Sequence, residues 1–137
     1  MLVRGRGISR GIASGVILVS RDAISFLSGV DPETGTIVEK GHPLCGRRIT
    51  GTILAFPYGK GSTVGSYILY ALSRNGNAPA AIINEEAEPI IATGAILGKI
   101  PMIDRIGIPV TCLKDGVPAT LNGELGTLEY DGELSPC

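Results

Sequence analysis

Between residues 49 and 103, segments typical of strands alternate with segments typical of helices. Short apolar runs indicate strands, and apolar residues at helical spacing indicate two helices between them. In chain order the segments are a strand over Ile49 to Phe56, a helix over Thr63 to Ser73, a strand over Ala80 to Asn84, a helix opened by Glu88-Pro89 and ending near Gly98, and a strand over Ile100 to Ile103. Because strands joined through helices pair in parallel by right-handed crossovers, this part of the chain predicts a parallel sheet.

Each predicted helix has an apolar face, which we expect to be buried against the sheet. The faces consist of Val64, Ile68, Leu69 and Leu72 in the first helix and Ile90, Ile91, Ala95 and Ile96 in the second. Asn75-Gly76 is a stop signal for the first helix, and proline is tolerated in the first turn of the second.

Both ends of the chain are rich in strand-like segments. They are Val3 to Ser9, Gly15 to Ser20 and Thr36 to Glu39 before the parallel unit, and Val110 to Leu113, Ala119 to Leu121 and Gly126 to Tyr130 after it. These segments suggest a partly closed β layer around the parallel unit. We therefore predict an α/β fold, a β/β/α barrel-like domain with a mixed sheet and two main helices, with a plain doubly wound sheet as the alternative.

Length and composition favour one compact domain over residues 1–137. Of these residues 44% are hydrophobic and 18% charged, and a chain of about this size buries roughly two-thirds of its unfolded surface. The net charge of −1 supplies no electrostatic footprint for nucleic acid, and no segment approaches the ~18 apolar residues of a membrane span. The N-terminus lacks the form of a signal peptide, so we expect a cytoplasmic protein without nucleic-acid or membrane partners.

Residues that bind metals are few. Cys45, Cys112 and Cys137 include no Cys-x-x-Cys pair, and His42 is the single histidine. The chain can complete neither a zinc site nor the four-cysteine ligation of an iron–sulfur cluster. We expect the three cysteines to be reduced and the chain to bind no metal, so any metal chemistry must come from another chain.

The turn Gly59-Lys60-Gly61-Ser62, between the first strand and the first helix, is the strongest candidate site. Its glycines bring bare backbone N–H groups up to a ligand, and the helix start adds unpaired donors and partial positive charge. Ser62 lies where these effects meet, so it is a helix cap, an anion ligand or an activated hydroxyl. The helix start contributes about 0.3–1 kcal/mol to a neighbouring charge and at most about 2. That is far too little to ionise a serine hydroxyl near neutral pH, so a catalytic Ser62 needs further cations.

Nucleotide-binding motifs fit this turn poorly. In a Walker A loop the lysine follows the second glycine, whereas Lys60 precedes Gly61. Gly59, Gly61 and Gly65 are spaced one residue longer than the dinucleotide fingerprint, and such a domain usually needs a larger sheet than this chain can build.

The other polar groups have structural explanations. His42 lies in a proline-containing turn, which favours a surface or hydrogen-bonding role over a general base, and the chain has no Gly-x-Ser-x-Gly elbow. Glu85, Glu86 and Glu88 precede a helix whose dipole favours acidic residues at its start. Asp104-Arg105 is expected to be a pair of solvated charges in a turn.

Four motifs, in order along the chain, resemble the aconitase X group. They are Gly29-Val30-Asp31-Pro32-Glu33-Thr34-Gly35, His42-Pro43-Leu44, Gly59-Lys60-Gly61-Ser62 and Ile100-Pro101-Met102-Ile103-Asp104. The resemblance covers nearly the whole chain and is strongest to the free-standing small subunits of archaeal members, which dehydrate (R)-5-phosphomevalonate to trans-anhydromevalonate 5-phosphate in isoprenoid biosynthesis. It implies an aconitase-like swivelling β/β/α domain, in agreement with the architecture predicted above.

The resemblance also implies a two-chain hydro-lyase that is inactive without its large subunit. The aconitase-like large subunit would carry an iron–sulfur cluster that polarises the leaving hydroxyl of a small phosphorylated hydroxy acid. Ser62 matches the family's serine that takes the proton beside the carboxylate, and Gly61 and Thr63 would present N–H groups to substrate oxygens. Lys60 is either a phosphate ligand or a solvated loop lysine.

Other functions are alternatives to this one. Related aconitase X proteins dehydrate a hydroxyproline, and aconitase-like small subunits act on other hydroxy acids. A non-catalytic swivelling module for binding or assembly would use Ser62 only as a cap. A phosphohistidine carrier needs a histidine at a helix entry, where this chain has Ser62 and Glu88-Pro89.

Overall fold

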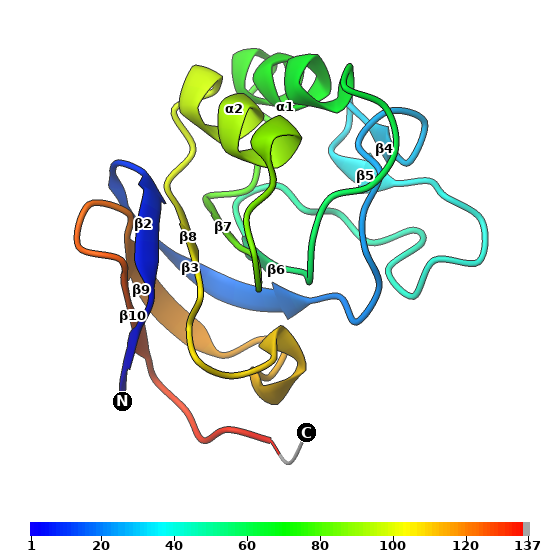
Figure 1. The fold of residues 1–137 in the computed structure, drawn as a ribbon. Helices are drawn as coiled ribbons and strands as arrows, with labels where there is room; N and C mark the ends of the chain where they lie inside the picture. The colour runs from blue at the N-terminus through cyan, green and yellow to red at the C-terminus, as the bar shows by residue number, and fades with distance from the viewer. Residues whose placement is uncertain (136–137) are drawn as a thin grey trace.

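The computed structural model describes residues 1–135, which form a mixed sheet of eight strands, a two-stranded sheet and two α-helices (Figure 1). The strands are β1 (Leu2–Arg4), β2 (Arg6–Ser9), β3 (Ile12–Val19), β4 (Val30–Asp31), β5 (Thr36–Ile37), β6 (Ile53–Ala55), β7 (Ala81–Ile83), β8 (Met102–Asp104), β9 (Pro118–Asn122) and β10 (Thr127–Tyr130). The helices are α1 (Gly65–Arg74), α2 (Pro89–Leu97) and the 3-10 helix η1 (Val110–Cys112). None of the helices in this range is long and apolar enough to cross a membrane.

The centre of the large sheet is parallel. Its strand order is β1-β10-β9-β3-β6-β7-β8-β2, and β3, β6, β7 and β8 pair in the same direction. α1 connects β6 to β7, and α2 connects β7 to β8. Both helices lie together above these strands in Figure 1. The alternating strand–helix unit predicted from the sequence is therefore confirmed.

Two apolar clusters occupy the two faces of the central strands. Side chains alternate along a strand, so neighbouring residues of β6 point to opposite faces. Leu54 belongs to the cluster that contains Leu69 and Ile91 of the helices. Ile53 belongs to the cluster that contains Leu121 of the antiparallel strands. Burial on both faces explains why the central strands are continuous apolar runs in the sequence.

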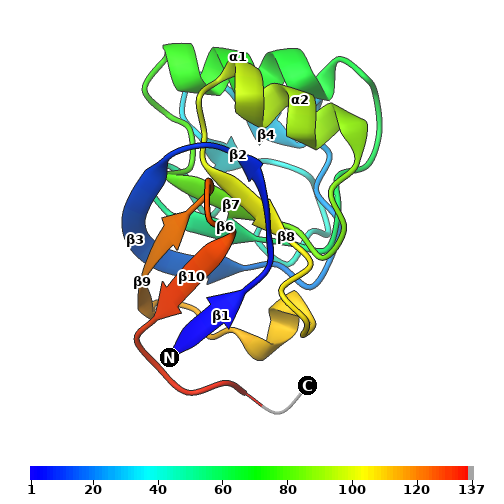
Figure 2. The ribbon, with the colours of Figure 1, turned by 60° about the vertical axis from the view of Figure 1, so that its left-hand side comes forward.

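The sheet closes on itself at Gly5. β1 and β2 stand at opposite ends of the strand order, yet only Gly5 separates them in the chain. The Gly5 N–H donates to the Gly126 carbonyl at 2.7 Å, and a Cβ on Gly5 would lie 2.3 Å from the Asp104 carbonyl oxygen. Figure 2 shows β1, β10, β9 and β3 curving round the side away from α1 and α2. The predicted α/β architecture, a β/β/α barrel-like domain, is confirmed.

α1 and α2 run parallel to each other. Near their N-termini, Gly65 of α1 lies beside Ile90 of α2. At their C-terminal ends, the Ser73 hydroxyl donates to the Gly98 carbonyl at 2.6 Å. The N-termini of both helices therefore lie at the same end of the helix layer, above the carboxyl ends of the strands that precede them.

Gly94→Ala tests the packing between the helices. A Cβ on Gly94 would lie 2.7 Å from Leu69 Cδ1 and 3.0 Å from Ser66 Cα, and the second of these is a backbone atom. We expect the free energy of unfolding to fall by about 1–3 kcal/mol, the usual cost of overpacking. Thermal or chemical unfolding measures the change. Thr93→Ala, at an exposed position of the same helix, is the control, and equal stability of the two variants would contradict close packing at Gly94.

The helix predictions differ from the structure in two details. α1 begins at Gly65 rather than Thr63, and Val64, predicted to be buried, is its N-cap and 42% exposed. Ile96, predicted on the buried face of α2, is 56% exposed. The buried face of α2 instead consists of Ile91, Gly94 and Ala95, because small residues allow α1 to approach.

Two predicted strands also differ. Val110 to Leu113, predicted as a strand, contains the 3-10 helix η1, in which the Cys112 N–H donates to the Pro109 carbonyl at 3.0 Å. The strand predicted from Ile49 begins only at Ile53, because the Thr52 N–H turns back to the Ile49 carbonyl at 3.1 Å.

Candidate functional site

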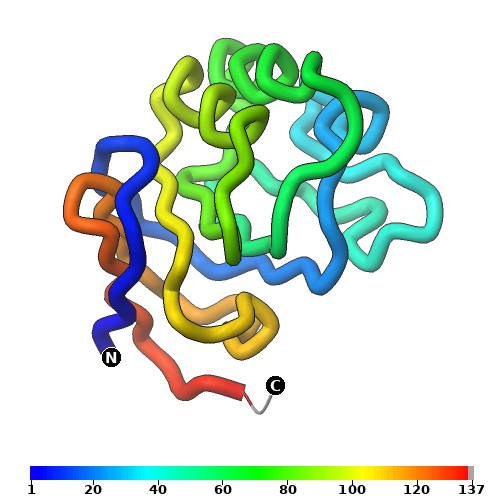
Figure 3. The backbone as a smooth tube through the Cα atoms, viewed as in Figure 1, coloured from blue at the N-terminus to red at the C-terminus, as the bar shows by residue number. Residues whose placement is uncertain are grey.

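Residues 56–64 lead from the carboxyl end of β6 to α1 and contain the predicted site. The green tube in Figure 3 rises from the sheet to the start of α1 along this segment. Because β6 and β7 are parallel neighbours, the loops that follow them leave from the same edge of the sheet. Ligands of parallel α/β sheets bind at this edge, outside the carboxyl ends of the strands.

The loop after β6 is tied to Ile24, which is fully buried. Ile24 pairs with Gly59 in an isolated parallel bridge. The Ile24 N–H donates to the Tyr58 carbonyl at 3.3 Å, and the Lys60 N–H donates to the Ile24 carbonyl at 3.0 Å. The loop is thereby fixed to the core just before it reaches Ser62.

Gly59 and Gly61 stand where a side chain has no room. A Cβ on Gly59 would lie 2.3 Å from Ile91 Cγ1 and 3.0 Å from Glu88 Oε1, so the loop backbone packs directly on the start of α2. Gly61 has a φ of +91°, and its Cβ would lie 2.7 Å from Ser25 Oγ. Glycine adopts this backbone conformation without strain, which leaves the loop backbone bare next to Ser62.

Ser62 is half-buried, and its hydroxyl oxygen accepts a hydrogen bond from the Val64 N–H at 3.1 Å. This local bond shapes the turn that leads into α1, but it satisfies none of the helix's own N–H groups, and within the described residues α1 has no side-chain cap bond at its N-cap Val64. Among residues 1–135 the Ser62 hydroxyl forms no other hydrogen bond. Its proton therefore has no acceptor in this part of the chain.

Three consecutive N–H groups, those of Gly61, Ser62 and Thr63, have no acceptor within the described residues. The donors that follow are satisfied, because the Gly65 N–H donates to the Ser62 carbonyl at 3.0 Å and the Ser66 N–H to the Thr63 carbonyl at 3.4 Å. A row of unpaired donors before a helix favours an anionic group. The structure thus places Gly61 and Thr63 on either side of Ser62 with free donors.

The acidic residues before α2 have structural roles. Glu88 is the N-cap of α2 and accepts two N–H groups of its first turn at 2.9 and 2.7 Å. Glu85 accepts the Val110 N–H at 3.1 Å, and Glu86 pairs with Arg105 at 2.7 Å. The predicted placement at the helix start is confirmed for Glu88, whereas Glu85 and Glu86 bind Val110 and Arg105 instead of the helix. Glu88 caps the N-terminus of α2, whereas in the described part of the chain the N-terminus of α1 has no side-chain cap. Of the two helix starts, that of α1 is therefore the one with donors available to a ligand.

Lys60 and His42 also have partners. Lys60 Nζ lies 3.2 Å from Glu39 Oε2, so its charge is paired on the protein surface. His42 is buried, and its Nδ1 accepts the Leu44 N–H at 3.0 Å while its Nε2 donates to the Ala23 carbonyl at 3.2 Å. Of the two roles predicted for His42, the hydrogen-bonding one is confirmed and the surface one is wrong, because the side chain is buried.

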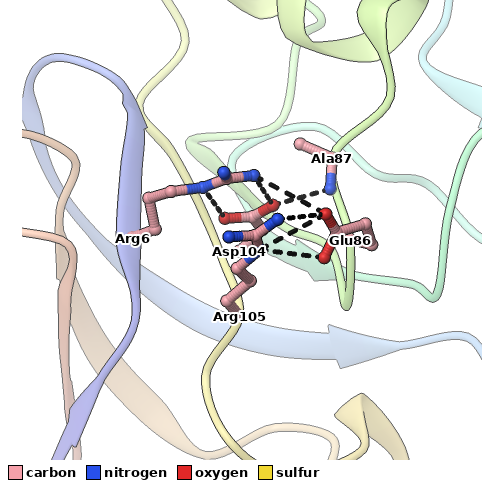
Figure 4. A network of polar contacts seen from close by, with 5 residues as sticks. All are labelled: Arg6, Glu86, Ala87, Asp104 and Arg105. Atoms are coloured by element: carbon pink, nitrogen blue, oxygen red, sulfur yellow. Dashed lines mark hydrogen bonds and ion pairs between the residues drawn. The ribbon is translucent and has the colours of Figure 1, made fainter.

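A second polar cluster lies at the carboxyl end of β8 (Figure 4). Nε and Nη2 of Arg6 donate to the two carboxylate oxygens of Asp104 at 2.9 and 2.7 Å, and the Ala87 N–H donates to Asp104 Oδ2 at 2.7 Å. Asp104 is completely buried. The expectation of a solvated turn charge at Asp104 is therefore wrong. Arg6 lies opposite Asp104 on the neighbouring strand β2 and binds its carboxylate.

The charges of this cluster hold Asp104 ionised. Burial acts to raise the pKa of its carboxyl, but hydrogen bonds from Arg6 and the Ala87 N–H, with the charges of Arg6 and Arg105, leave the pKa below its ordinary value of 3.8. Hydrogen bonds from Arg105 likewise lower the pKa of the Glu86 carboxyl. Because Ala87 directly precedes the α2 cap, the Asp104 carboxylate fixes the turn against which Gly59 packs.

Exposed tyrosines lie on either side of Ser62 in the chain. Three of the four tyrosines form this set, which we call the tyrosine rim: Tyr58 is 54% exposed, Tyr67 67% and Tyr70 41%. Tyr130, the fourth, is buried. Tyrosine is enriched at protein–protein interfaces, so the rim is suited to contact with another chain.

Potential metal ligands are dispersed. Across residues 1–135 no three His, Cys, Asp or Glu side chains are placed to hold a metal ion. Cys45 is free and exposed. Cys112 is disulfide-bonded, so the prediction of reduced cysteines is wrong for this residue, and Cys137 lies outside the described residues.

Comparisons of sequence with known proteins point to one family. The family model described as the aconitase X swivel domain matches residues 2–130. A Methanocella arvoryzae protein named phosphomevalonate dehydratase small subunit is 57% identical over 130 residues, covering 94% of this chain and 98% of that protein. A Pyrococcus furiosus protein of the same name is 52% identical over 129 residues, covering 94% of this chain and 95% of that protein.

Solved structures agree with the sequence comparisons. The crystal structure of Thermococcus kodakaraensis aconitase X in its holo form superposes with a TM-score of 0.90 at 49% sequence identity, over 95% of this chain and 98% of that chain. A second structure, determined by NMR in solution, gives a TM-score of 0.86 at 44% identity over the same shares. Since the family model, the relatives and the folds all match along nearly the whole length, the chain belongs to the aconitase X swivel domain family.

Proposed function

We propose that this chain is the small subunit of phosphomevalonate dehydratase, a two-chain hydro-lyase that converts (R)-5-phosphomevalonate to trans-anhydromevalonate 5-phosphate in isoprenoid biosynthesis. The observation that carries the proposal is identity of 57% and 52%, over almost the full length, to archaeal proteins of that name. In this proposal residues 1–137 form a single swivelling domain of a cytoplasmic enzyme. Its partners are a large aconitase-like subunit and a small phosphorylated hydroxy acid, without nucleic acid or membrane.

Ser62 is the proton acceptor in this proposal. Dehydration removes a proton from the carbon beside the carboxylate, the electron pair of that C–H bond forms the double bond, and the hydroxyl on the adjacent carbon leaves with its bonding electron pair and takes up a separate proton to become water. The Val64 N–H already donates to Ser62 Oγ, which favours negative charge on that oxygen. The free N–H groups of Gly61 and Thr63 bind substrate oxygens beside it, which orients the C–H bond toward Ser62.

Ser62 requires activation from outside its own chain. No charged side chain among residues 1–135 hydrogen-bonds to its hydroxyl, and the helix start supplies only about 0.3–1 kcal/mol. Cationic groups of the large subunit must therefore meet Ser62 when the swivelling domain closes. The tyrosine rim supports this arrangement, because its exposed side chains precede and follow Ser62 in the chain and are of a type enriched at protein interfaces.

The iron–sulfur cluster belongs to the large subunit in this proposal. The described part of this chain does not fit the group, since Cys45 is a lone exposed thiol and no three metal-binding side chains come together. We assign to this chain a base and backbone donors rather than cluster ligands.

The isolated chain is expected to be inactive on phosphomevalonate, and activity is expected once the large subunit is added. The reason is that Ser62 lacks cationic partners of its own. Formation of anhydromevalonate phosphate, followed by mass spectrometry, measures both reactions. Substantial turnover by the isolated chain would contradict the two-chain proposal. A parallel assay with hydroxyproline separates the alternatives, because turnover of that substrate alone would assign the complex to the hydroxyproline dehydratases.

A further inference from the structure

The hydrogen-bond ladder between β6 and β7 leaves its regular pattern where the Ser62 loop begins. The Phe56 N–H donates to the Ile83 carbonyl at 3.0 Å, as a parallel ladder requires. The next bond of that ladder would run from the Glu85 N–H to the Phe56 carbonyl. Instead the Glu85 N–H donates to the Pro57 carbonyl at 3.0 Å. The Phe56 carbonyl thus loses its backbone partner at the last residue before the loop.

The side chain of Asn84 replaces the missing donor. Its Nδ2 donates to the Phe56 carbonyl at 3.0 Å and to the Ile83 carbonyl at 3.2 Å. Both partners are acceptors, so they fix which end of the amide carries the nitrogen. Asn84 therefore clamps the carboxyl ends of β6 and β7 together at the point where β6 turns into the loop.

The other end of the Asn84 amide has no partner. The residue is completely buried, and its Oδ1 is the one buried side-chain nitrogen or oxygen atom in residues 1–135 without a hydrogen bond. Burying an unpaired acceptor costs free energy, and an apolar side chain of similar size would avoid that cost. The amide donor at this position must therefore supply something that outweighs the unpaired oxygen.

We propose that Asn84 is a positioning residue for Ser62. Pro57 follows Phe56 directly, and the loop is tied to Ile24 beyond it, so the direction in which the chain leaves Phe56 determines where Ser62 lies. By fixing the Phe56 carbonyl, Asn84 sets this direction without contacting Ser62 itself. The inference rests on the proposed function to the extent that Ser62 is the catalytic residue.

Asn84→Leu in the two-chain enzyme tests the proposal. Leucine fills a similar volume but removes both the amide donor and the unpaired oxygen. We expect kcat to fall about 10²-fold, since a displacement of about 1 Å at a reacting group costs that much, with KM changing far less. Asn84→Asp keeps the shape but places a carboxylate against two carbonyls, and we expect it to lose at least as much activity.

Asn77 offers a matched control. It is also buried, and its Nδ2 likewise donates to two backbone carbonyls, those of Pro32 at 3.3 Å and Glu33 at 2.7 Å, in the turn between β4 and β5. Asn77→Leu is expected to lower the melting temperature but to keep kcat within about twofold. A kcat of Asn84→Leu within twofold of wild type, or an equal loss in Asn77→Leu, would overturn the positioning role.

Hydrogen exchange on the same complexes gives a readout that does not depend on the reaction. We expect the hydrogen-bonded amides of the loop, those of Lys60 and Val64, to exchange faster in Asn84→Leu than in wild type and to be unchanged in Asn77→Leu. Unchanged exchange in this segment of Asn84→Leu would sink the proposal. If the wild-type complex dehydrates none of the substrates, the proposed function fails, and the exchange result still decides whether Asn84 holds the loop.

Discussion

Ser62→Ala is expected to lower kcat of the two-chain enzyme by about 10²–10⁴-fold, the usual contribution of a positioned acid–base group. The reason is that the proposed proton transfer ends on Ser62 Oγ, and alanine offers no acceptor there. Initial rates at saturating substrate measure the loss. Co-purification of the two chains checks assembly, which should persist because the Ser62 side chain supplies only a local bond to the Val64 N–H.

Two further variants separate proton transfer from the turn-forming bond of Ser62. Ser62→Asn keeps an oxygen that can accept the Val64 N–H, because an asparagine side chain forms the same turn with the backbone two residues on, but it has no hydroxyl. It should be as stable as wild type and as inactive as Ser62→Ala. Ser73→Ala removes a hydroxyl at the opposite end of α1, where it donates to Gly98, and should keep wild-type turnover. Wild-type turnover in both Ser62→Ala and Ser62→Asn would leave Ser62 only the turn-forming bond to Val64.

The parallel unit was predictable from the sequence because its signals are local. Apolar runs such as Ala80 to Asn84 are continuous because both faces of a central strand are buried. Asn75-Gly76 follows directly after the last residue of α1, so it indicates where the helix ends. The glycines around Lys60 marked the loop for the same reason. Each of these signals lies within one element or one turn, so no knowledge of distant contacts was needed.

The details of the site depend on contacts that no local pattern reveals. The start of α1 was predicted two residues early, because the Ser62 side chain holds residues 62–64 in a separate turn. Unpaired N–H groups are expected at this turn from its glycines and the helix start, but which three they are depends on where α1 begins. The role of Asn84 is not visible in the sequence either, because an asparagine after a strand is common in turns. Its bond to the Phe56 carbonyl depends on how the neighbouring strand β6 ends.

Asp104 was misinterpreted for a similar reason. Its partner Arg6 is 98 positions away, and the two meet only because β2 joins β8 when the sheet closes. In the sequence, Asp104-Arg105 has the appearance of a charged turn. An ion pair between residues so far apart in the sequence can therefore be predicted only once the order of the strands in the sheet is known.

Asp104→Ala is expected to lower the free energy of unfolding by roughly 2–3 kcal/mol. The carboxylate accepts three hydrogen bonds, from two nitrogens of Arg6 and from the Ala87 N–H. Charge-assisted bonds contribute about 1.5–3 kcal/mol each, but the exposed guanidinium of Arg6 regains solvation when its partner is removed. The half-buried Ala87 N–H is less able to do so. Chemical denaturation of the isolated chain measures the change.

The same carboxylate predicts how stability depends on pH. The pKa of Asp104 in the folded chain lies below 3.8, its ordinary value, so the unfolded chain binds the proton first as pH falls. The stabilisation from the Asp104 carboxylate is complete at a pH about one unit above 3.8. It is lost as the pH falls through the lowered pKa of the folded chain. The difference in unfolding free energy between wild type and Asp104→Asn should accordingly shrink below about pH 4.

Glu86→Gln is the matched control for both measurements. Glu86 belongs to the same cluster and its pKa is also lowered, but its side chain is 62% exposed and pairs with the exposed Arg105. Water and salt screen such a pair, so this variant should shift the unfolding midpoint much less than Asp104→Ala. Comparable losses in the two variants would mean that surface charge, rather than the buried carboxylate of Asp104, joins β2 to β8. A constant difference between wild type and Asp104→Asn down to pH 2 would contradict an ionised Asp104 as the source of the stability.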